Sequence, residues 1–98
     1  MNAELKIYKD CTSEEPTKVY TCRRLLFKTS KEVTALAEQL KGKTEEEQIE
    51  INIKVIKTIF PDFLAEEFEY IDPVEWLNFV NEIGRETAQI LKHAQKNS

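Results

Sequence analysis

The sequence predicts one α+β domain over residues 1–98 that is mostly helical, with an N-terminal two-stranded β-hairpin followed by about four helices. We expect these helices at approximately 30–41, 45–60, 63–70 and 73–94. A chain of 98 residues suits a single hydrophobic core. Its 41% apolar and 33% charged residues are typical of a folded domain rather than a disordered chain. With only 2 Gly and 3 Pro, it lacks the turns of an all-β meander.

Two short segments near the N-terminus predict the hairpin. Leu5 and Ile7 alternate with polar residues, which is typical of a half-buried strand. Residues 17–22 are β-branched and aromatic, and the polar residues 10–16 between the segments indicate a loop. Because an isolated hairpin is marginally stable, we expect it to lie against an apolar surface.

The helix over 30–41 is predicted from its ends and its spacing. Thr29 and Glu32 form a capping-box pattern, so the helix should begin near Ser30. Gly42 supplies a left-handed residue that ends it. The apolar residues at helical spacing are Val33, Leu36, Ala37 and Leu40.

The helix over 45–60 begins with a second capping box, Thr44 and Glu47. Residues 49–55 alternate like a strand, and that alternative stays open. Continuation of the apolar pattern to Phe60 favours a helix. Its apolar face is broad, which indicates a central helix in contact with several neighbours.

Pro61 ends that helix, and a short helix over 63–70 follows. The last helix has the sharpest start, because Asp72 can cap it, Pro73 suits its first turn and Glu75 completes the capping pattern. Its apolar positions are Trp76, Val80, Ile83, Thr87, Ile90 and Ala94, widened by Leu77 and Leu91.

Two further features concern this last helix. Gly84 lies on its apolar side, where close approach by a neighbouring element would explain an interior glycine. Residues 95–98 are polar, and we expect them to form a loose tail.

Charge and cysteine usage indicate a cytosolic protein with reduced thiols. The net charge of −4 opposes binding to a phosphate backbone, and we interpret the Arg23-Arg24 pair as a solvated strand end. Cys11 and Cys22 fit neither a disulfide scaffold nor a zinc site. The N-terminus lacks the apolar region of a signal peptide, and no stretch approaches the ~20 apolar residues of a membrane span.

The motifs of catalysis and of cofactor binding are missing from the sequence. His93, the only histidine, lies near the C-terminus, where a catalytic base would lack a rigid setting. The acidic residues at 45–47 and 66–69 do not follow the order of a calcium loop. We therefore expect no enzyme, no cofactor, no metal, no nucleic acid, no membrane and no small-molecule substrate.

Aromatic residues gather between positions 60 and 79. One interpretation is a core around the short third helix. The other is a surplus of rings that covers a partner-binding surface, since aromatic anchors often carry interface energy. The candidate residues for that surface are Phe63, Phe68, Trp76 and Phe79. The 4-3 spacing of the last helix also suits self-association into a homo-oligomer, although core packing produces the same spacing.

Three short sequence motifs follow the predicted strand pair and the first predicted helix. They are Ile56–Phe63, which ends an apolar helix with Ile-Phe-Pro, then Ala65–Phe68, then Tyr70–Leu77 with Ile-Asp-Pro. In their order and residues, these motifs resemble those of the tail assembly chaperones of long-tailed (siphophage-type) bacteriophages or prophages. The layout matches over most of the chain, whereas the polar loop with Cys11 and Pro16 has no counterpart that we can assign.

The resemblance implies a function. Such chaperones act in the host bacterial cytoplasm, where they bind the long apolar tape measure protein and keep it soluble until the tail tube protein polymerises around it. They are absent from the mature virion, and many have a longer form made by frameshifting. The resemblance therefore implies the tape measure protein, and also the tail tube protein, as partners. The alternatives are a structural head–tail or tail component of the particle, and a small regulatory or antitoxin-like binding module.

Overall fold

The structure of the protein is a computed structural model, and it describes residues 1–96. The chain forms a hairpin of β1 (Ala3–Ile7) and β2 (Lys18–Cys22). Three α-helices and one 3₁₀ helix follow, namely α1 (Phe27–Glu38), α2 (Glu45–Ile59), η1 (Ala65–Tyr70) and α3 (Pro73–Lys96). This confirms the prediction of a mostly helical α+β chain with an N-terminal hairpin.

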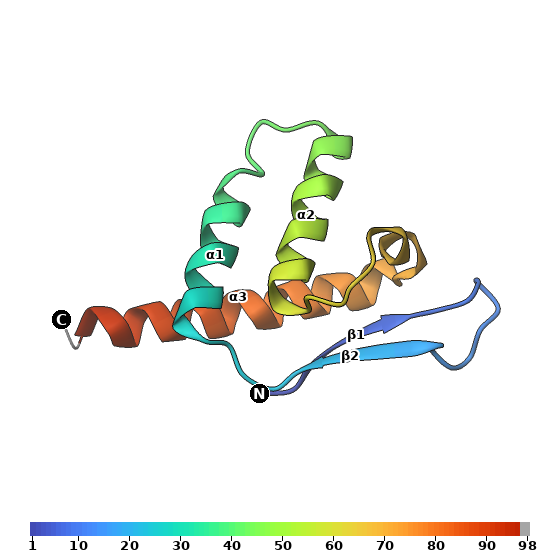
Figure 1. The fold of residues 1–98 in the computed structure, drawn as a ribbon, viewed down its shortest axis with the longest axis horizontal. Coiled ribbons are helices and arrows are strands. Elements are labelled where there is room, and N and C mark those ends of the chain that lie inside the picture. The colour runs from blue at the N-terminus through green and yellow to red at the C-terminus, as the bar shows by residue number, and fades with distance from the viewer. Residues whose placement is uncertain (97–98) are drawn as a thin grey trace.

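The longest helix, α3, runs along the long axis of the molecule (Figure 1). The hairpin lies along one side of it, and α1 and α2 form an antiparallel arm that rises from another side. α3 contacts both β1 and α1, whereas α2 packs chiefly against α1. The prediction that the broad apolar face of helix 45–60 contacts several neighbours is confirmed for its second half, because Ile56 is a core residue and Ile53, Val55 and Ile59 pack against the core that the hairpin, α1 and α3 share. The extents of 49 × 31 × 22 Å reflect this open shape.

The hairpin pairs as the alternation in the sequence predicts. Leu5 lies opposite Tyr20, and Ala3 lies opposite Cys22, in an antiparallel register. These four side chains are buried, whereas Val19 on the other face of β2 is exposed. The hairpin thus covers α3 with one face, as a marginally stable two-stranded sheet requires.

The core lies where the hairpin, the end of α2 and α3 meet. Its centre is a chain of aromatic rings: the Tyr20 ring is 5.3 Å from Phe60 and 5.6 Å from Phe63, and the Phe60 ring is 5.9 Å from Phe79. The other buried members are Ala3, Leu5, Ile7, Cys22, Val33, Ile56 and Ile83.

A polar contact ties the hairpin to η1. The Tyr20 hydroxyl donates to Glu67 Oε1, which also accepts from the Leu64 N–H at 2.9 Å. Lys18 Nζ lies 3.5 Å from Glu67 Oε2. Burial tends to raise the pKa of Glu67, but the hydrogen bonds from Tyr20 and Leu64 and the charge of Lys18 outweigh it, so this pKa lies below its ordinary value.

The start of α1 differs from the prediction. The helix begins at Phe27 rather than near Ser30, because the Ser30 N–H already donates to the Leu26 carbonyl at 3.0 Å. Among the described residues, no side chain caps this start, so the predicted Thr29–Glu32 capping box is not used. The helix ends at Glu38, and Gly42 adopts the predicted left-handed conformation with φ +73° in the turn that follows.

The start of α2 matches the prediction and excludes the strand alternative. Glu47 N–H donates to Thr44 Oγ1 at 3.3 Å, and Thr44 N–H donates to Glu47 Oε1 at 3.1 Å. These two bonds are the reciprocal pair of a capping box.

The helices after Pro61 also differ in detail. The segment predicted as a helix over 63–70 is the 3₁₀ helix η1, which begins at Ala65. Asp72 caps α3 as predicted, since its Oδ1 accepts from the Val74 N–H at 2.8 Å. The Glu75 N–H donates to Asp72 Oδ1 at 3.3 Å, which is one half of the predicted capping pattern, whereas the Glu75 carboxylate accepts from the Tyr8 hydroxyl at 2.9 Å.

α3 also runs further than the predicted 73–94, since it extends to Lys96. Of the loose tail predicted over 95–98, the first two residues are therefore helical, and 97–98 lie outside the described residues. Among the described helices, none is long and apolar enough to span a bilayer.

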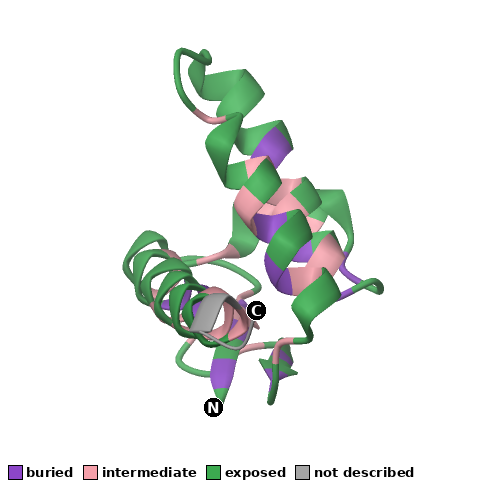
Figure 2. Ribbon diagram, turned by 90° about the vertical axis from the view of Figure 1, so that its left-hand side faces the viewer, coloured by how far each residue is buried: buried purple, intermediate pink, exposed green. Residues whose placement is uncertain are grey.

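The buried side of α3 is rotated relative to the prediction. Phe79, Ile83 and Thr87 are buried, whereas Val80 is 41% exposed. Gly84 is also exposed, and a Cβ at this position would meet no described atom within 4 Å, so close approach within this chain does not explain the glycine. Figure 2, which looks along α3 from its C-terminal end, shows exposed residues over its outer side.

Candidate functional site

The four aromatic residues proposed from the sequence lie together but point mostly inward. Phe63 and Phe79 are only 2% and 3% exposed, so in this conformation they belong to the core and are not accessible to a partner. Phe68 and Trp76 are half-buried, and their rings meet edge to face at 5.5 Å. The sequence therefore identified a real cluster, but only Phe68 and Trp76 reach the surface.

The titratable residues of the described chain form no metal-binding cluster of three or more His, Cys, Asp or Glu side chains. Cys22 is buried; its burial raises the pKa of the thiol, and its Sγ lies 3.3 Å from the Arg24 carbonyl oxygen. Cys11 and His93 are exposed on separate elements, the hairpin loop and α3. These three side chains thus lie on three different parts of the described chain, namely β2, the hairpin loop and α3.

A pocket of about 560 Å³ lies between the hairpin loop and the junction of η1 with α3. Tyr8 links its two sides, because its hydroxyl donates to Glu75 and its N–H donates to the Tyr70 carbonyl at 2.9 Å. Asp10 is already used by the loop, where the Thr12 hydroxyl and N–H donate to its Oδ1. Tyr8 and Asp10 thus both have hydrogen-bond partners within the fold. We interpret the pocket as part of the contact region between the hairpin and α3.

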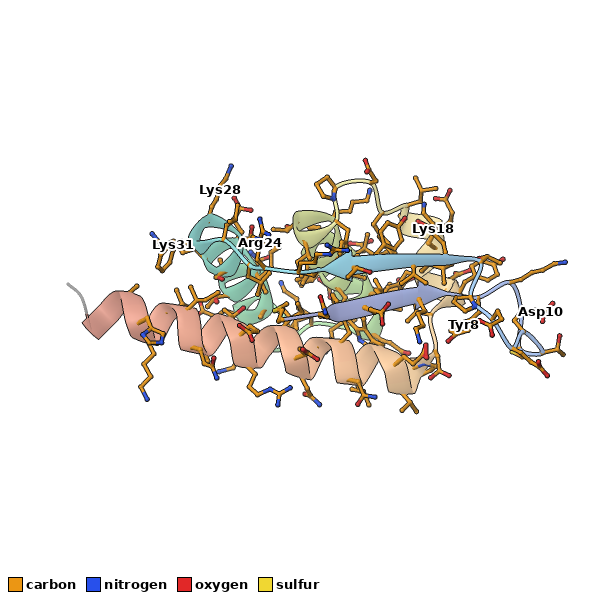
Figure 3. The ribbon with its side chains drawn as sticks, turned by 90° about the horizontal axis from the view of Figure 1, so that it is seen from below. Tyr8, Asp10, Lys18, Arg24, Lys28 and Lys31 are labelled. Carbon is orange, nitrogen blue, oxygen red and sulfur yellow. The ribbon has the colours of Figure 1, made fainter. Side chains whose placement is uncertain are left out.

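Two large apolar side chains that are neighbours in the sequence are both exposed at the start of α1. Leu26 and Phe27 are 62% and 55% exposed. Four cations surround them in sequence, and all four are exposed. We call this surface the cationic–apolar patch, and its residues are Arg23, Arg24, Leu26, Phe27, Lys28 and Lys31. In Figure 3, Arg24, Lys28 and Lys31 gather around the beginning of α1.

The charges of this patch are not explained by helix stability. A helix N-terminus carries a partial positive charge, so acidic residues stabilise it and cations do not. The first turn of α1 has no acidic residue, and Lys28 lies within it. By contrast, α2 follows the rule, with Glu45, Glu46 and Glu47 in its first turn. A local rule broken without structural gain is typical of a functional surface.

Sequence reasoning misses this patch for a specific reason. The Arg23-Arg24 pair alone is too short to indicate a surface, and the capping pattern predicts a helix start near Ser30. Once α1 begins at Phe27, Lys28 and Lys31 are three residues apart on one helix and thus share a face. The available signal is the absence of any acidic residue from Pro16 to Lys31 in a chain with 18 acidic residues.

A second apolar surface runs along the outer side of α3. Val74 and Leu77 are 66% and 59% exposed, and Val80, Gly84 and Ala88 follow them along the helix. We call this surface the α3 stripe, and its residues are Val74, Leu77, Val80, Gly84, Ala88 and Leu91. Monomeric proteins often expose single apolar residues, but a continuous row along one helix is typical of an interface.

No family model matches the chain, and no curated protein and no solved structure matches it either. The resemblance described above therefore remains a prediction from the sequence.

Proposed function

We propose that the protein is a non-catalytic binding protein, a tail assembly chaperone of a long-tailed phage or prophage. In this proposal it binds an apolar, helix-forming segment of the tape measure protein in the host cytoplasm and keeps that segment soluble. The observation that supports this most directly is the cationic–apolar patch, where two adjacent large apolar side chains are more than half exposed.

The chemistry of the patch defines the kind of segment that it would bind. Leu26 and Phe27 offer apolar area, and aromatic and arginine side chains are enriched among the residues that dominate binding energy. A complementary segment has an apolar face with acidic residues beside it. An amphipathic helix of the tape measure protein that docks by its apolar face meets this description.

The charge of the rest of the chain would orient the bound segment. The net charge is −4, although the patch contributes four cations, so the remaining surface is strongly acidic. Acidic side chains of the client would be attracted to the patch and repelled elsewhere, which fixes the register more than the affinity. The net negative charge also keeps complexes apart in solution.

The role in assembly follows from the resemblance. Polymerising tail tube protein would replace the chaperone along the tape measure protein, and the chaperone would not enter the virion. Mass spectrometry of purified particles separates this proposal from that of a structural tail component, which would be found in the particles in stoichiometric amounts.

Co-expression with the tape measure protein of the same phage tests the proposal. A variant with Leu26→Ser and Phe27→Ser should lose co-purification of the tape measure protein, because the apolar part of the patch is gone. The matched control is Leu64→Ser, which removes a 50% exposed leucine from outside the patch and should keep co-purification. Equal co-purification by both folded variants would contradict the proposal for this surface.

A further inference from the structure

The α3 stripe is an apolar face that the described chain leaves uncovered. The chain covers the side of α3 that holds Phe79 and Ile83, while the stripe beside it remains exposed at Leu77 and Val80. The stripe itself carries no charged residue. Glu75 and Glu82 of α3 lie elsewhere, beside Glu4 and Lys6 of β1. Covering the stripe would therefore bury little charge, as suits the centre of an interface.

The residues of the stripe are arranged symmetrically about Gly84. Leu77 and Leu91 each lie seven residues from it, and Val80 and Ala88 each lie four residues from it. Seven residues are close to two helical turns, so both leucines lie on the same side of the helix as the glycine. The order of side-chain sizes is thus nearly the same in both directions along α3.

Such a pattern is self-complementary. In a two-fold symmetric contact, each residue meets its mate on the other copy and the mate makes the same contact in return. A two-fold axis through Gly84 would place Leu77 against the second copy's Leu91, and Val80 against its Ala88. Because a Cβ at Gly84 would meet no described atom of this chain within 4 Å, the space above the glycine is free for a second helix backbone.

The exposed area of the chain is sufficient for such a contact. The accessible surface is 7141 Å² for an 11.5 kDa chain, whereas a compact monomer of this mass has about 5,800 Å². The surplus is therefore roughly 1,300 Å², compared with about 800 Å² per partner in a standard specific interface. The projecting arm and the long α3 give the molecule its open shape (Figure 1).

We propose that two copies of this chain pair antiparallel through the α3 stripe, with Gly84 at the two-fold axis. The contact includes no residue of the cationic–apolar patch, so the dimer retains two such patches. The inference does not depend on the proposed client, because it concerns the protein alone.

Disulfide trapping tests the pairing and its direction. In a Cys11→Ser background, which removes the exposed native thiol, Gly84→Cys should form a disulfide-linked dimer under mild oxidation, since the Cα atoms at position 84 of the two copies would both lie close to the axis. The matched control Gln89→Cys is exposed but lies about 140° around the helix from Gly84, so it should form no disulfide-linked dimer under the same oxidation.

A mixture of two single variants separates antiparallel from parallel pairing. Leu77→Cys mixed with Leu91→Cys should give the 77–91 heterodisulfide, because in the antiparallel dimer two copies of position 77 lie roughly 21 Å apart along the helix. A predominance of 77–77 and 91–91 disulfides would overturn the proposal.

Sedimentation equilibrium provides a readout without cysteines. The unmodified protein should sediment as a dimer at high micromolar concentration, and Leu77→Glu or Val80→Lys should shift it to monomer while the circular dichroism spectrum remains helical. A monomer at every concentration for the unmodified chain would overturn the proposal. Two independent variants are used so that poor folding of one leaves the test intact.

Discussion

The inner and outer faces of α3 have similar side chains and opposite environments. Phe79 and Ile83 are 3% exposed, whereas Leu77 and Val80 on the outer face are 59% and 41% exposed. Helical periodicity in the sequence reveals one wide apolar arc but does not reveal how much of it the chain itself covers. The uncovered part is therefore where binding partners are to be sought.

The largest expected effect is the difference in unfolding free energy between truncating a side chain on the inner face of α3 and truncating one on its outer face. Phe79→Ala should destabilise the fold by about 3–5 kcal/mol, because it leaves a cavity in the aromatic core. Leu77→Ala should change the free energy of unfolding of the monomer by about 0.5 kcal/mol or less. Urea unfolding at a concentration too low for self-association measures both. Similar losses for the two variants would mean that the outer face is covered by the chain's own residues.

The hairpin, which covers the inner face of α3, is joined to η1 by the hydrogen bond between Tyr20 and Glu67. Tyr20→Phe should cost about 1–3 kcal/mol, because the Glu67 carboxylate loses a donor while its side chain is only 12% exposed. A Tyr70→Phe variant is the control, since the Tyr70 side chain is half exposed on the surface. An unchanged urea midpoint for Tyr20→Phe would show that this hydrogen bond does not stabilise the fold.

The same contact predicts a pH dependence. The pKa of Glu67 in the folded state lies below its ordinary value of 4.5, so the folded state binds this proton less readily than the unfolded state. Its contribution to stability is therefore complete above pH 4.5 and is lost as the pH falls through the folded-state pKa. The difference in unfolding free energy between the unmodified protein and Tyr20→Phe should shrink over that range, whereas a constant difference would argue against an ionised Glu67 as the acceptor.

Thr87 lies at the edge of the inner face with an unpaired polar group. It is 7% exposed, and its Oγ1 has no hydrogen-bond partner among the described residues. Thr87→Val keeps the shape and removes the buried hydroxyl, so it should stabilise the fold by about 1–2 kcal/mol. The matched Thr34→Val should instead destabilise it, because Thr34 Oγ1 donates to the Ser30 carbonyl at 2.8 Å. Calorimetric melting of the pair checks the opposite signs.

Gly84→Ala should have opposite effects on the monomer and on the dimer. An alanine in a helix interior is favoured over glycine by about 1 kcal/mol, and the added Cβ meets open space in this chain. The melting temperature of dilute protein should therefore rise. In the dimer the two methyl groups would meet at the axis, so the dissociation constant should increase. An increase in stability at all concentrations would show that the outer face is free.

Strong local signals in the sequence predict much of the fold. Thr44 with Glu47 and Asp72 before Pro73 mark the starts of α2 and α3, because a side chain that caps a helix is a local interaction. The same reasoning misplaces the start of α1. Its Thr29–Glu32 pattern is a valid cap in isolation, but the backbone continues the helix back to Phe27.

The surfaces are harder to predict than the elements. Phe79 and Val80 are neighbours in an apolar pattern, and only the position of the hairpin and of α1 against α3 decides which of them is buried. The cationic–apolar patch depends on where α1 begins, since that start brings Lys28 and Lys31 onto one face. Tertiary packing, which a single sequence does not display, decides both cases.

In the proposed function, the cationic–apolar patch holds an apolar client in solution. The most direct measurement is the soluble fraction of the tape measure protein when it is expressed with this protein or with the Leu26→Ser and Phe27→Ser variant. We expect a soluble tape measure protein with the unmodified chain and with Leu64→Ser, and an insoluble one with the patch variant. A tape measure protein that is equally soluble in all three cases, or insoluble in all three, would contradict the proposed function.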